Sequence, residues 1–184
     1  MNRSSLDKVI SSTGLIIALV LFAAAGGLLY AHNFIHDQVR NQLSAEKITF
    51  PAAASAGLMA LSADDRAAVS KYAGQQLVNG VQAEAFADHY IAAHLKNVGG
   101  GKTYAELSAA SLAAPTDTAL AGKVQTVFRG ETLRGLLLNA YAFDTMAMVA
   151  GLAAIGAVAA GILLLVLSLL GFYHAGRVTQ KKRH

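Results

Sequence analysis

The stretch from Thr145 to Tyr173, TMAMVAGLAAIGAVAAGILLLVLSLLGFY, contains no charged side chain. A second uncharged stretch, VISSTGLIIALVLFAAAGGLLYA, runs from Val9 to Ala31. An α-helix rises ~1.5 Å per residue, so ~20 apolar residues cover the ~30 Å hydrocarbon core of a bilayer. The sequence therefore predicts an all-α membrane protein whose two transmembrane helices lie at 13–31 and 145–173. The second stretch is longer than a bilayer requires, so we expect it to tilt or to extend past the interface.

A cleaved signal peptide is the alternative interpretation of the first stretch. Arg3 and Lys8 would form its basic region, and the small residues from Ala23 to Gly27 would offer a cleavage site. The chain continues unbroken from Met1 through this stretch into the next segment. We therefore expect the first stretch to be retained as a transmembrane helix.

The distribution of Lys and Arg predicts the orientation in the plasma membrane. The stub at 1–12 holds two of these residues, whereas the segment at 32–144 holds nine against ten Asp and Glu. The remaining basic residues lie in the tail at 174–184, namely Arg177, Lys181, Lys182 and Arg183. Basic residues next to membrane spans favour the cytoplasmic side. Both termini are therefore expected in the cytoplasm, with the segment 32–144 outside, and the tail is expected to contact anionic lipid headgroups.

The segment 32–144 is expected to fold as a helical bundle. It contains no strand-like alternation, it is rich in Ala, and only Pro51 and Pro115 interrupt it. Ser62 has the features of a helix N-cap, and we expect that helix to continue to Asn79. The chain has no cysteine. Disulfides, thiol catalysis and thiolate metal sites are therefore excluded.

Two motifs invite a chemical interpretation. The run GGGKT from Gly99 to Thr103 resembles part of a phosphate-binding loop, but position 96, where that motif needs glycine, is Lys96. We therefore predict neither nucleotide nor nucleic-acid binding. His32 and His36 lie four residues apart on one helical face and are weak candidates for a metal or haem site. The alternative is that they are interfacial residues, so no cofactor and no catalytic site are predicted.

Small residues at a spacing of four occur in both spans, and this spacing allows close packing of helices in lipid. The residues are Ala23 and Gly27 in the first span, and Ala147, Gly151, Gly156 and Ala160 in the second. Neither span contains a charged side chain of the kind that ion-coupled transport requires. We therefore expect the spans to pack against other helices and not to transport a solute alone.

Four motifs carry a resemblance to a known family. The sequences AEKITFP, YAGQQ, GGKTYAELS and VFRGETLRGLLLNAY, over residues 35–145, resemble those of a family of small two-span membrane proteins from actinobacteria. The resemblance implies the same architecture and no particular chemistry. It also suggests a host complex, the joined cytochrome bcc and aa3 oxidase assembly. Within these motifs Arg129, Glu131 and Arg134 are predicted either to form a docking surface or to make ordinary ion pairs with the neighbouring helix.

These features favour a non-enzymatic accessory subunit that stabilises or positions the membrane-protein subunits of a larger complex. An extracytoplasmic sensor or ligand-binding protein is the first alternative, but the segment after Tyr173 is too short for a signalling domain. A self-assembling membrane protein is the second alternative, although its spans offer few polar residues to line a pore.

Overall fold

The fold was analysed in a computed structural model, which describes residues 3–181. All regular structure in this part of the chain is helical, and the chain divides into two compact units. The paired-helix unit consists of Met1–Phe34 with Met146–His184, and the middle unit consists of Ile35–Thr145. The predicted all-α fold class is thus confirmed. Of the predicted lipid-contacting residues, Lys182 and Arg183 lie outside the described residues, as does the side chain of Lys181.

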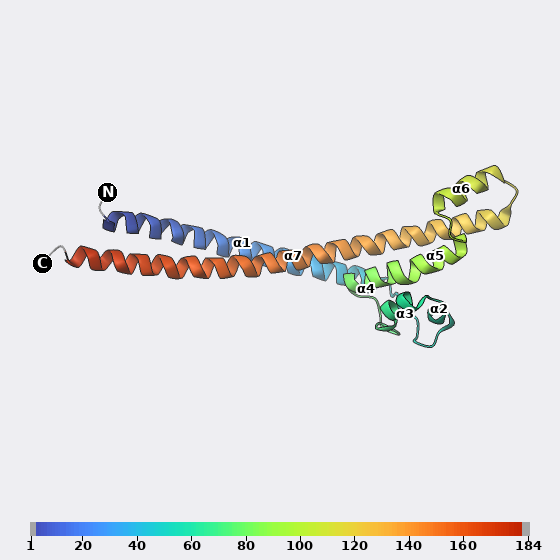
Figure 1. Cartoon of the computed structure of the whole chain (residues 1–184), viewed down its shortest axis with the longest axis horizontal. Coiled ribbons are helices and arrows are strands. Elements are labelled where there is room, and N and C mark those ends of the chain that lie inside the picture. Colours follow the sequence, from blue (N-terminus) through green and yellow to red (C-terminus); the bar gives the residue numbers. More distant parts are fainter. Residues whose placement is uncertain (1–2, 182–184) are drawn as a thin grey trace. The chain divides into compact units, whose positions relative to one another are not determined.

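Two helices are long and apolar enough to cross a membrane: α1 (Arg3–Ala45) and α7 (Thr118–Lys181). Neither contains a proline, so no backbone donor is lost along them. Helix α1 ends at Ala45, before Pro51. Lys47 then takes a left-handed conformation with φ 53°, which turns the chain out of the helix. Within the paired-helix unit, the first part of α1 and the last part of α7 run side by side in opposite directions (Figure 1).

The middle unit begins with two short helices, the second of which is shorter than the sequence predicts. Helices α2 (Ala56–Met59) and α3 (Ala63–Ser70) are capped by Ser55 and Ser62. The predicted continuation of the second helix to Asn79 is wrong, because α3 ends at Ser70. Asn79 instead caps the start of the next helix, since its side chain accepts a hydrogen bond from the backbone of Gln82. An isolated β-bridge between Thr49 and Gln76 joins the extended segment after α1 to the extended segment before α4.

A continuous helical run follows, made of α4 (Gly80–Ala85), η1 (Phe86–Ile91) and α5 (Ala92–Gly99). The central part, η1, is a π-helical segment, which the sequence does not predict. Gly100 ends the run in a left-handed conformation with φ 60°, which glycine adopts without steric cost.

Helix α6 (Tyr104–Ala113) starts with a capping box. The Thr103 side chain accepts a hydrogen bond from the Glu106 backbone, and the Glu106 carboxylate accepts one from the Thr103 backbone. Pro115 lies in the short turn before α7. Helix α7 then continues without interruption from Thr118 into the long apolar stretch.

The core of the middle unit is aromatic and aliphatic. Phe50, Leu58, Val69 and Leu77 are almost completely buried. The ring of Phe50 meets the ring of Phe86 edge-on, with 5.2 Å between centroids. These contacts hold the short helices α2 and α3 against the run from Gly80 to Gly99.

Candidate functional site

Small residues at every seventh position join α1 and α7 in the paired-helix unit. On α1 they are Ser4, Ser11, Ala18 and Ala25, followed by His32; on α7 they are Ala147, Ala154, Gly161, Ser168 and Ala175. All except Ser4 and His32 are buried. Seven residues make nearly two helical turns, so these positions form one narrow seam on each helix. Small side chains along this seam let the two backbones approach closely.

Two hydrogen bonds define the antiparallel register of this seam. The Ser4 hydroxyl donates to the carbonyl oxygen of Ala175, at 3.3 Å. The Nδ1–H of His32 donates to the carbonyl oxygen of Ala147, at 2.7 Å. The two ends of the seam are therefore fixed by contacts that only this register allows.

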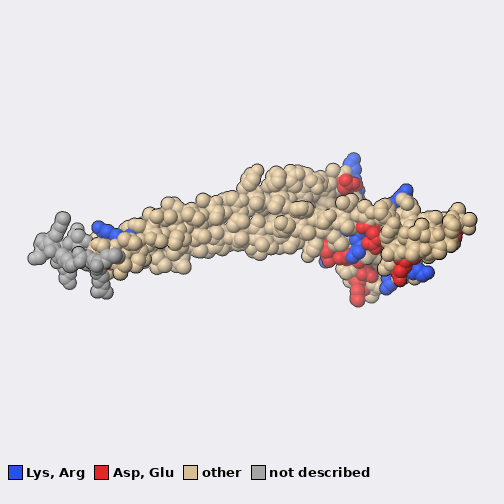
Figure 2. Space-filling view, turned by 90° about the horizontal axis from the view of Figure 1, so that it is seen from above, with Lys and Arg blue, Asp and Glu red and all other residues tan. Residues whose placement is uncertain are grey.

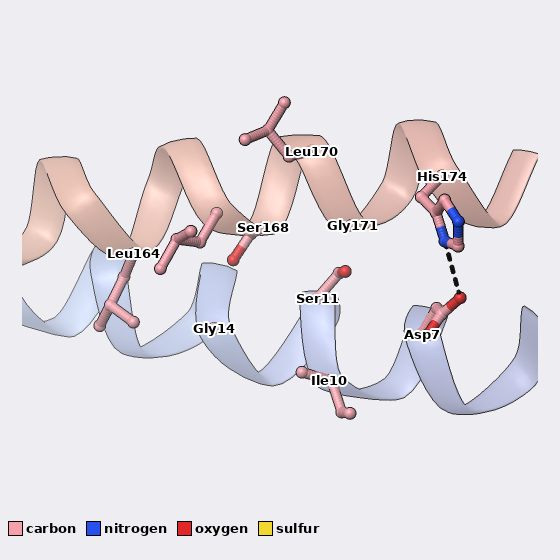
Figure 3. Close-up of a pocket in the computed structure, with 10 residues that line it drawn as sticks. Asp7, Ile10, Ser11, Gly14, Leu164, Ser168, Leu170, Gly171 and His174 are labelled. Carbon is pink, nitrogen blue, oxygen red and sulfur yellow. Dashed lines mark hydrogen bonds and ion pairs between the residues drawn. The ribbon is translucent and has the colours of Figure 1, made fainter. Parts of the chain in front are cut away.

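A groove of about 450 Å³ opens along the seam near the chain termini. Figure 3 shows Ser11 and Ser168 between the two helices, and a hydrogen bond from the His174 ring to the Asp7 carboxylate at 3.3 Å. Gly14 keeps this region open, because a Cβ there would lie 2.5 Å from the Ser168 hydroxyl. The groove is thus lined mainly by apolar side chains, with a few polar groups from Ser11, Ser168 and the Asp7–His174 pair.

The predicted packing residues divide into two groups. Ala147 is buried in the seam, and a Cβ on Gly151 would lie 2.9 Å from Nδ1 of His32, so both pack within the chain. The other four, Ala23, Gly27, Gly156 and Ala160, are exposed, and both glycines face open space. Only these four remain available to a separate helix.

The predicted histidine pair is held by two different acceptors. The Nδ1 of His32 bonds to the Ala147 carbonyl, and the Nδ1–H of His36 donates to Oδ1 of Asp144, at 2.8 Å. Within residues 3–181, no group of three or more His, Asp or Glu side chains is arranged to hold a metal ion. The structure therefore gives the weak metal candidates His32 and His36 hydrogen-bonding roles.

Asp144 is a site residue that the sequence does not single out. It is 7% exposed, and its Oδ2 accepts a hydrogen bond from the backbone N–H of Gly80, at 2.9 Å. A carboxylate at a helix N-terminus is stabilised by the unpaired backbone donors there. Asp144 therefore ties the start of α4 to α7, while its second oxygen holds His36. The sequence offers no signal for this contact, because the three residues are far apart along the chain.

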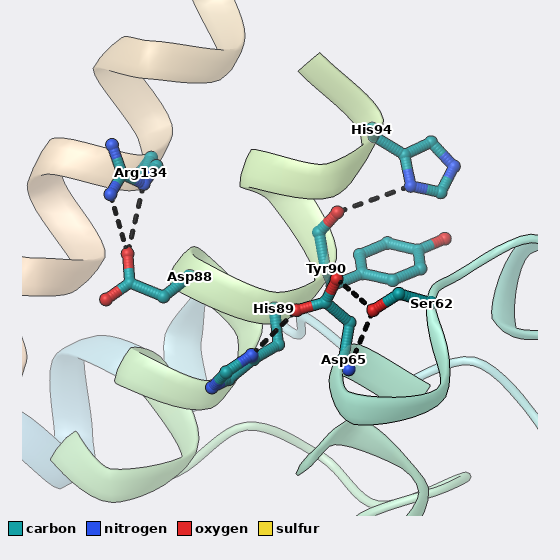
Figure 4. Close-up of polar contacts among 7 residues, drawn as sticks. All are labelled: Ser62, Asp65, Asp88, His89, Tyr90, His94 and Arg134. Atoms are coloured by element: carbon teal, nitrogen blue, oxygen red, sulfur yellow. Dashed lines mark hydrogen bonds and ion pairs between the residues drawn. The ribbon is translucent and has the colours of Figure 1, made fainter. Parts of the chain in front are cut away.

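A second polar cluster lies between α3 and η1 in the middle unit (Figure 4). The Nδ1–H of His89 donates to Oδ1 of Asp65 at 2.9 Å, and the Ser62 hydroxyl donates to Oδ2 of Asp65 at 2.7 Å. Hydrogen bonds from Ser62, and then from His89, lower the pKa of Asp65 below its ordinary value. The serine bonds to the carboxylate and not to the imidazole, so this is not the arrangement that activates a serine nucleophile.

Of the three residues predicted as a docking surface, Arg134 is used inside the chain. Two of its N–H groups donate to Oδ1 of Asp88, at 2.7 and 3.1 Å, and a third donates to Glu131 at 3.3 Å. The main partner of Arg134 is thus Asp88 on η1, and not a residue of the outer part of α1. The hydrogen bonds that Arg134 donates to Asp88, and to a smaller extent the one that it donates to Glu131, raise the pKa of Arg134. Arg129 is exposed.

The tail residue Arg177 lies over the ring of Tyr173, with 4.7 Å between the guanidinium carbon and the ring centroid. An arginine stacked on an aromatic ring is typical of a cation–π contact. Both side chains are exposed at the end of α7, where an interfacial anchor is expected.

Comparison of the chain with protein-family models, with curated proteins and with solved structures finds no match. The resemblance to an actinobacterial membrane-protein family therefore stays a prediction from the sequence.

Proposed function

We propose that the chain is a two-span membrane protein that serves as a non-catalytic accessory subunit of a larger membrane complex. In this proposal the paired-helix unit lies in the plasma membrane, both termini are cytoplasmic and the middle unit is extracytoplasmic. The cytochrome bcc–aa3 assembly is the host suggested by the sequence resemblance.

The observation that carries the proposal is the exposed apolar surface of the two long helices. Only 11% of the most apolar window of α1, and 17% of that of α7, is buried inside the chain. The core helix of a water-soluble protein would be mostly buried, whereas these helices expose large side chains such as Ile16, Val20, Leu152 and Ile155. The paired helices also show a long uncharged surface in Figure 2. Apolar surface of this extent needs lipid or another protein to cover it.

Retention of α1 is supported by its fit to α7. Residues at every seventh position along α1 face matching small residues on α7. A signal peptide that is cut off and discarded needs no such complementarity with a distant part of the chain.

The accessory role is supported by the division of the small residues. Ala147 and Gly151 join the two spans to each other, while Gly27 and Gly156 face open space on the outer surface. Exposed small residues in a membrane helix favour close packing against a further helix. The polar clusters of the middle unit are engaged in structural hydrogen bonds, which agrees with a role in assembly.

The absence of cysteine allows orientation to be tested with single-cysteine variants. Ser70 and Ser5 are both exposed, the first at the end of α3 and the second near the start of α1. We expect a membrane-impermeant maleimide to label Ser70→Cys in intact cells and to label Ser5→Cys only after permeabilisation. Labelling of Ser5→Cys in intact cells would contradict the proposed orientation.

The packing role is tested by two matched substitutions on α7. Neither Gly156 nor Gly122 has any atom within 4 Å of the position that a Cβ would occupy, and both are exposed, so a side chain added at either position meets no clash at its Cβ. We expect Gly156→Leu to reduce co-purification of the host subunits and Gly122→Leu, in the middle unit, to leave it unchanged. Equal recovery with both variants would refute packing through this face of the span.

A further inference from the structure

An apolar groove of about 360 Å³ lies in the middle unit, between the outer part of α1 and α7. Its walls include Val39 and Leu43 from α1, Ile48 after it, and Leu133, Leu136 and Phe143 from α7. The proposed topology leaves this groove outside the hydrocarbon core, with Phe143 at the end nearest to the membrane. An open apolar groove in this position indicates an interaction surface.

The α7 side of the groove has the pattern of a helix–helix seam. Leu133, Leu136, Ala140 and Phe143 follow one another at spacings of three and four residues, as do the contact positions of a coiled coil. Leu133 is 40% exposed, Leu136 62% and Phe143 54%. The neighbouring Leu137 is only 3% exposed and packs in the core of the middle unit. Ala140 is partly buried against that core, whereas Leu133, Leu136 and Phe143 leave large parts of their side chains exposed on this face of α7.

Two opposite charges lie at the far end of this face. Glu46 lines the groove beside Leu133, and Arg129 lies one helical turn beyond Leu133 on the same face of α7. Among residues 3–181, neither side chain takes part in an ion pair. Glu46 follows His36 by ten residues and Arg129 precedes Asp144 by fifteen. At ~1.5 Å per residue, they lie about 15 Å and about 22 Å from the His36–Asp144 contact along the helix axes. Long side chains bridge a height difference of this size.

We propose that this face binds a second copy of the same chain in a two-fold symmetric dimer. The inference rests on the proposed two-span topology, which makes the α7 helices of two copies parallel in one membrane. A two-fold axis along the membrane normal brings Leu136 and Phe143 of each copy into the groove of the other. The same axis places Arg129 of each copy opposite Glu46 of its partner, so one face supplies both charges of each pair. The exposed small residues of the spans remain available to the host complex.

Cross-linking through a single cysteine tests the dimer in native membranes. Leu136 is 62% exposed, so Leu136→Cys preserves the fold; the matched control is Leu112→Cys on α6, where the leucine is 81% exposed. We expect oxidation to give a disulfide-linked dimer with Leu136→Cys and a monomer with Leu112→Cys. The proposal would be overturned by a monomer with both variants or by a dimer with both. It would also be overturned if Leu136→Cys formed a cross-link to a different protein, or if its thiol did not react because lipid covers it.

Charge reversal separates a second copy from an unrelated partner. Arg129→Glu alone and Glu46→Arg alone each place like charges together across a two-fold interface, and we expect each to weaken the dimer about 5- to 30-fold. The double variant Arg129→Glu/Glu46→Arg restores opposite charges in both pairs, so it should recover the cross-linking yield of the parent Leu136→Cys chain. Failure of the double variant to recover would overturn the pairing. An unrelated partner keeps its own charges, so the double variant would not recover its binding.

The failure of this inference is distinguishable from that of the proposed function. A chain that resists carbonate extraction but remains monomeric overturns the dimer alone. A chain that carbonate extracts from the membrane overturns the two-span topology, and the dimer with it.

Discussion

The contact between Gly80 and Asp144 gives the most specific prediction for the middle unit. Gly80 has an ordinary negative φ, so alanine is compatible with its backbone conformation. A Cβ at this position would nevertheless lie 2.5 Å from Cβ of Asp144 and 3.0 Å from Cα of Tyr141. The second contact is with backbone, so rotation of a side chain cannot relieve it. Gly80→Ala must therefore push the start of α4 away from α7.

The size of the effect follows from two contributions. Overpacking of a well-packed site costs about 1–3 kcal/mol, and loss of a hydrogen bond to a charged acceptor costs about 1.5–3 kcal/mol. Movement of α4 relieves the first cost by breaking the Gly80 N–H···Asp144 hydrogen bond, so the two do not simply add. We expect Gly80→Ala to lower the free energy of opening of α4 by about 2–4 kcal/mol.

Hydrogen exchange measured by mass spectrometry on the detergent-solubilised protein provides the assay. A loss of about 2–4 kcal/mol makes the amides of α4 exchange roughly 30- to 1,000-fold faster, since 1.4 kcal/mol is a factor of ten. The control is Gly135→Ala on α7, where a Cβ faces open space and alanine favours the helix by about 0.5–1 kcal/mol. Unchanged exchange of α4 in Gly80→Ala would refute the close contact between α4 and α7.

Three further substitutions test other parts of the molecule. The pKa of Asp65 is lowered from 3.8, so its ionised carboxylate contributes to stability above that pH, and this contribution is lost as the pH falls through the lower folded-state pKa. Asp65→Asn should therefore lower the thermal midpoint at pH 7. The difference in thermal midpoint between the variant and the parent chain should narrow below pH 3.8. A double-mutant cycle of Arg134→Lys with Asp88→Asn should give a coupling of about 0.5–1 kcal/mol, because both side chains are about one-third exposed. A Cβ on Gly161 would lie 2.9 Å from the Phe22 ring; Gly161→Leu should therefore separate the paired helices in spin-label distance measurements, whereas Gly156→Leu should not.

Most helices of the fold can be predicted from local features of the sequence. The uncharged stretches predict both long helices, and Thr103 with Glu106 predicts the start of α6, because these signals depend on residues within a few turns of each other. The end of α3 is not predicted, because Asn79 favours helix starts as well as helix ends. Its role is decided by Gln82 and by the bridge between Thr49 and Gln76, which brings distant segments together.

The candidate sites are less predictable, because they depend on which helices face each other. The search for small residues four apart finds Ala147 and Gly151. It does not find the small residues seven apart that form the seam. That spacing is visible in the sequence once α1 and α7 are aligned in opposite directions. The hydrogen bond from Gly80 to Asp144 has no such signal, since the sequence next to a span does not show whether a carboxylate there is exposed or buried.

Affinity purification of the tagged chain from its native membrane in mild detergent, with quantitative mass spectrometry and a visible absorption spectrum, tests the accessory role most directly. The proposal predicts subunits of a larger membrane complex at near-stoichiometric yield, with haem bands if the host is the cytochrome bcc–aa3 assembly. Recovery of the chain alone or only with copies of itself, without absorbance in the visible range, would contradict the accessory role.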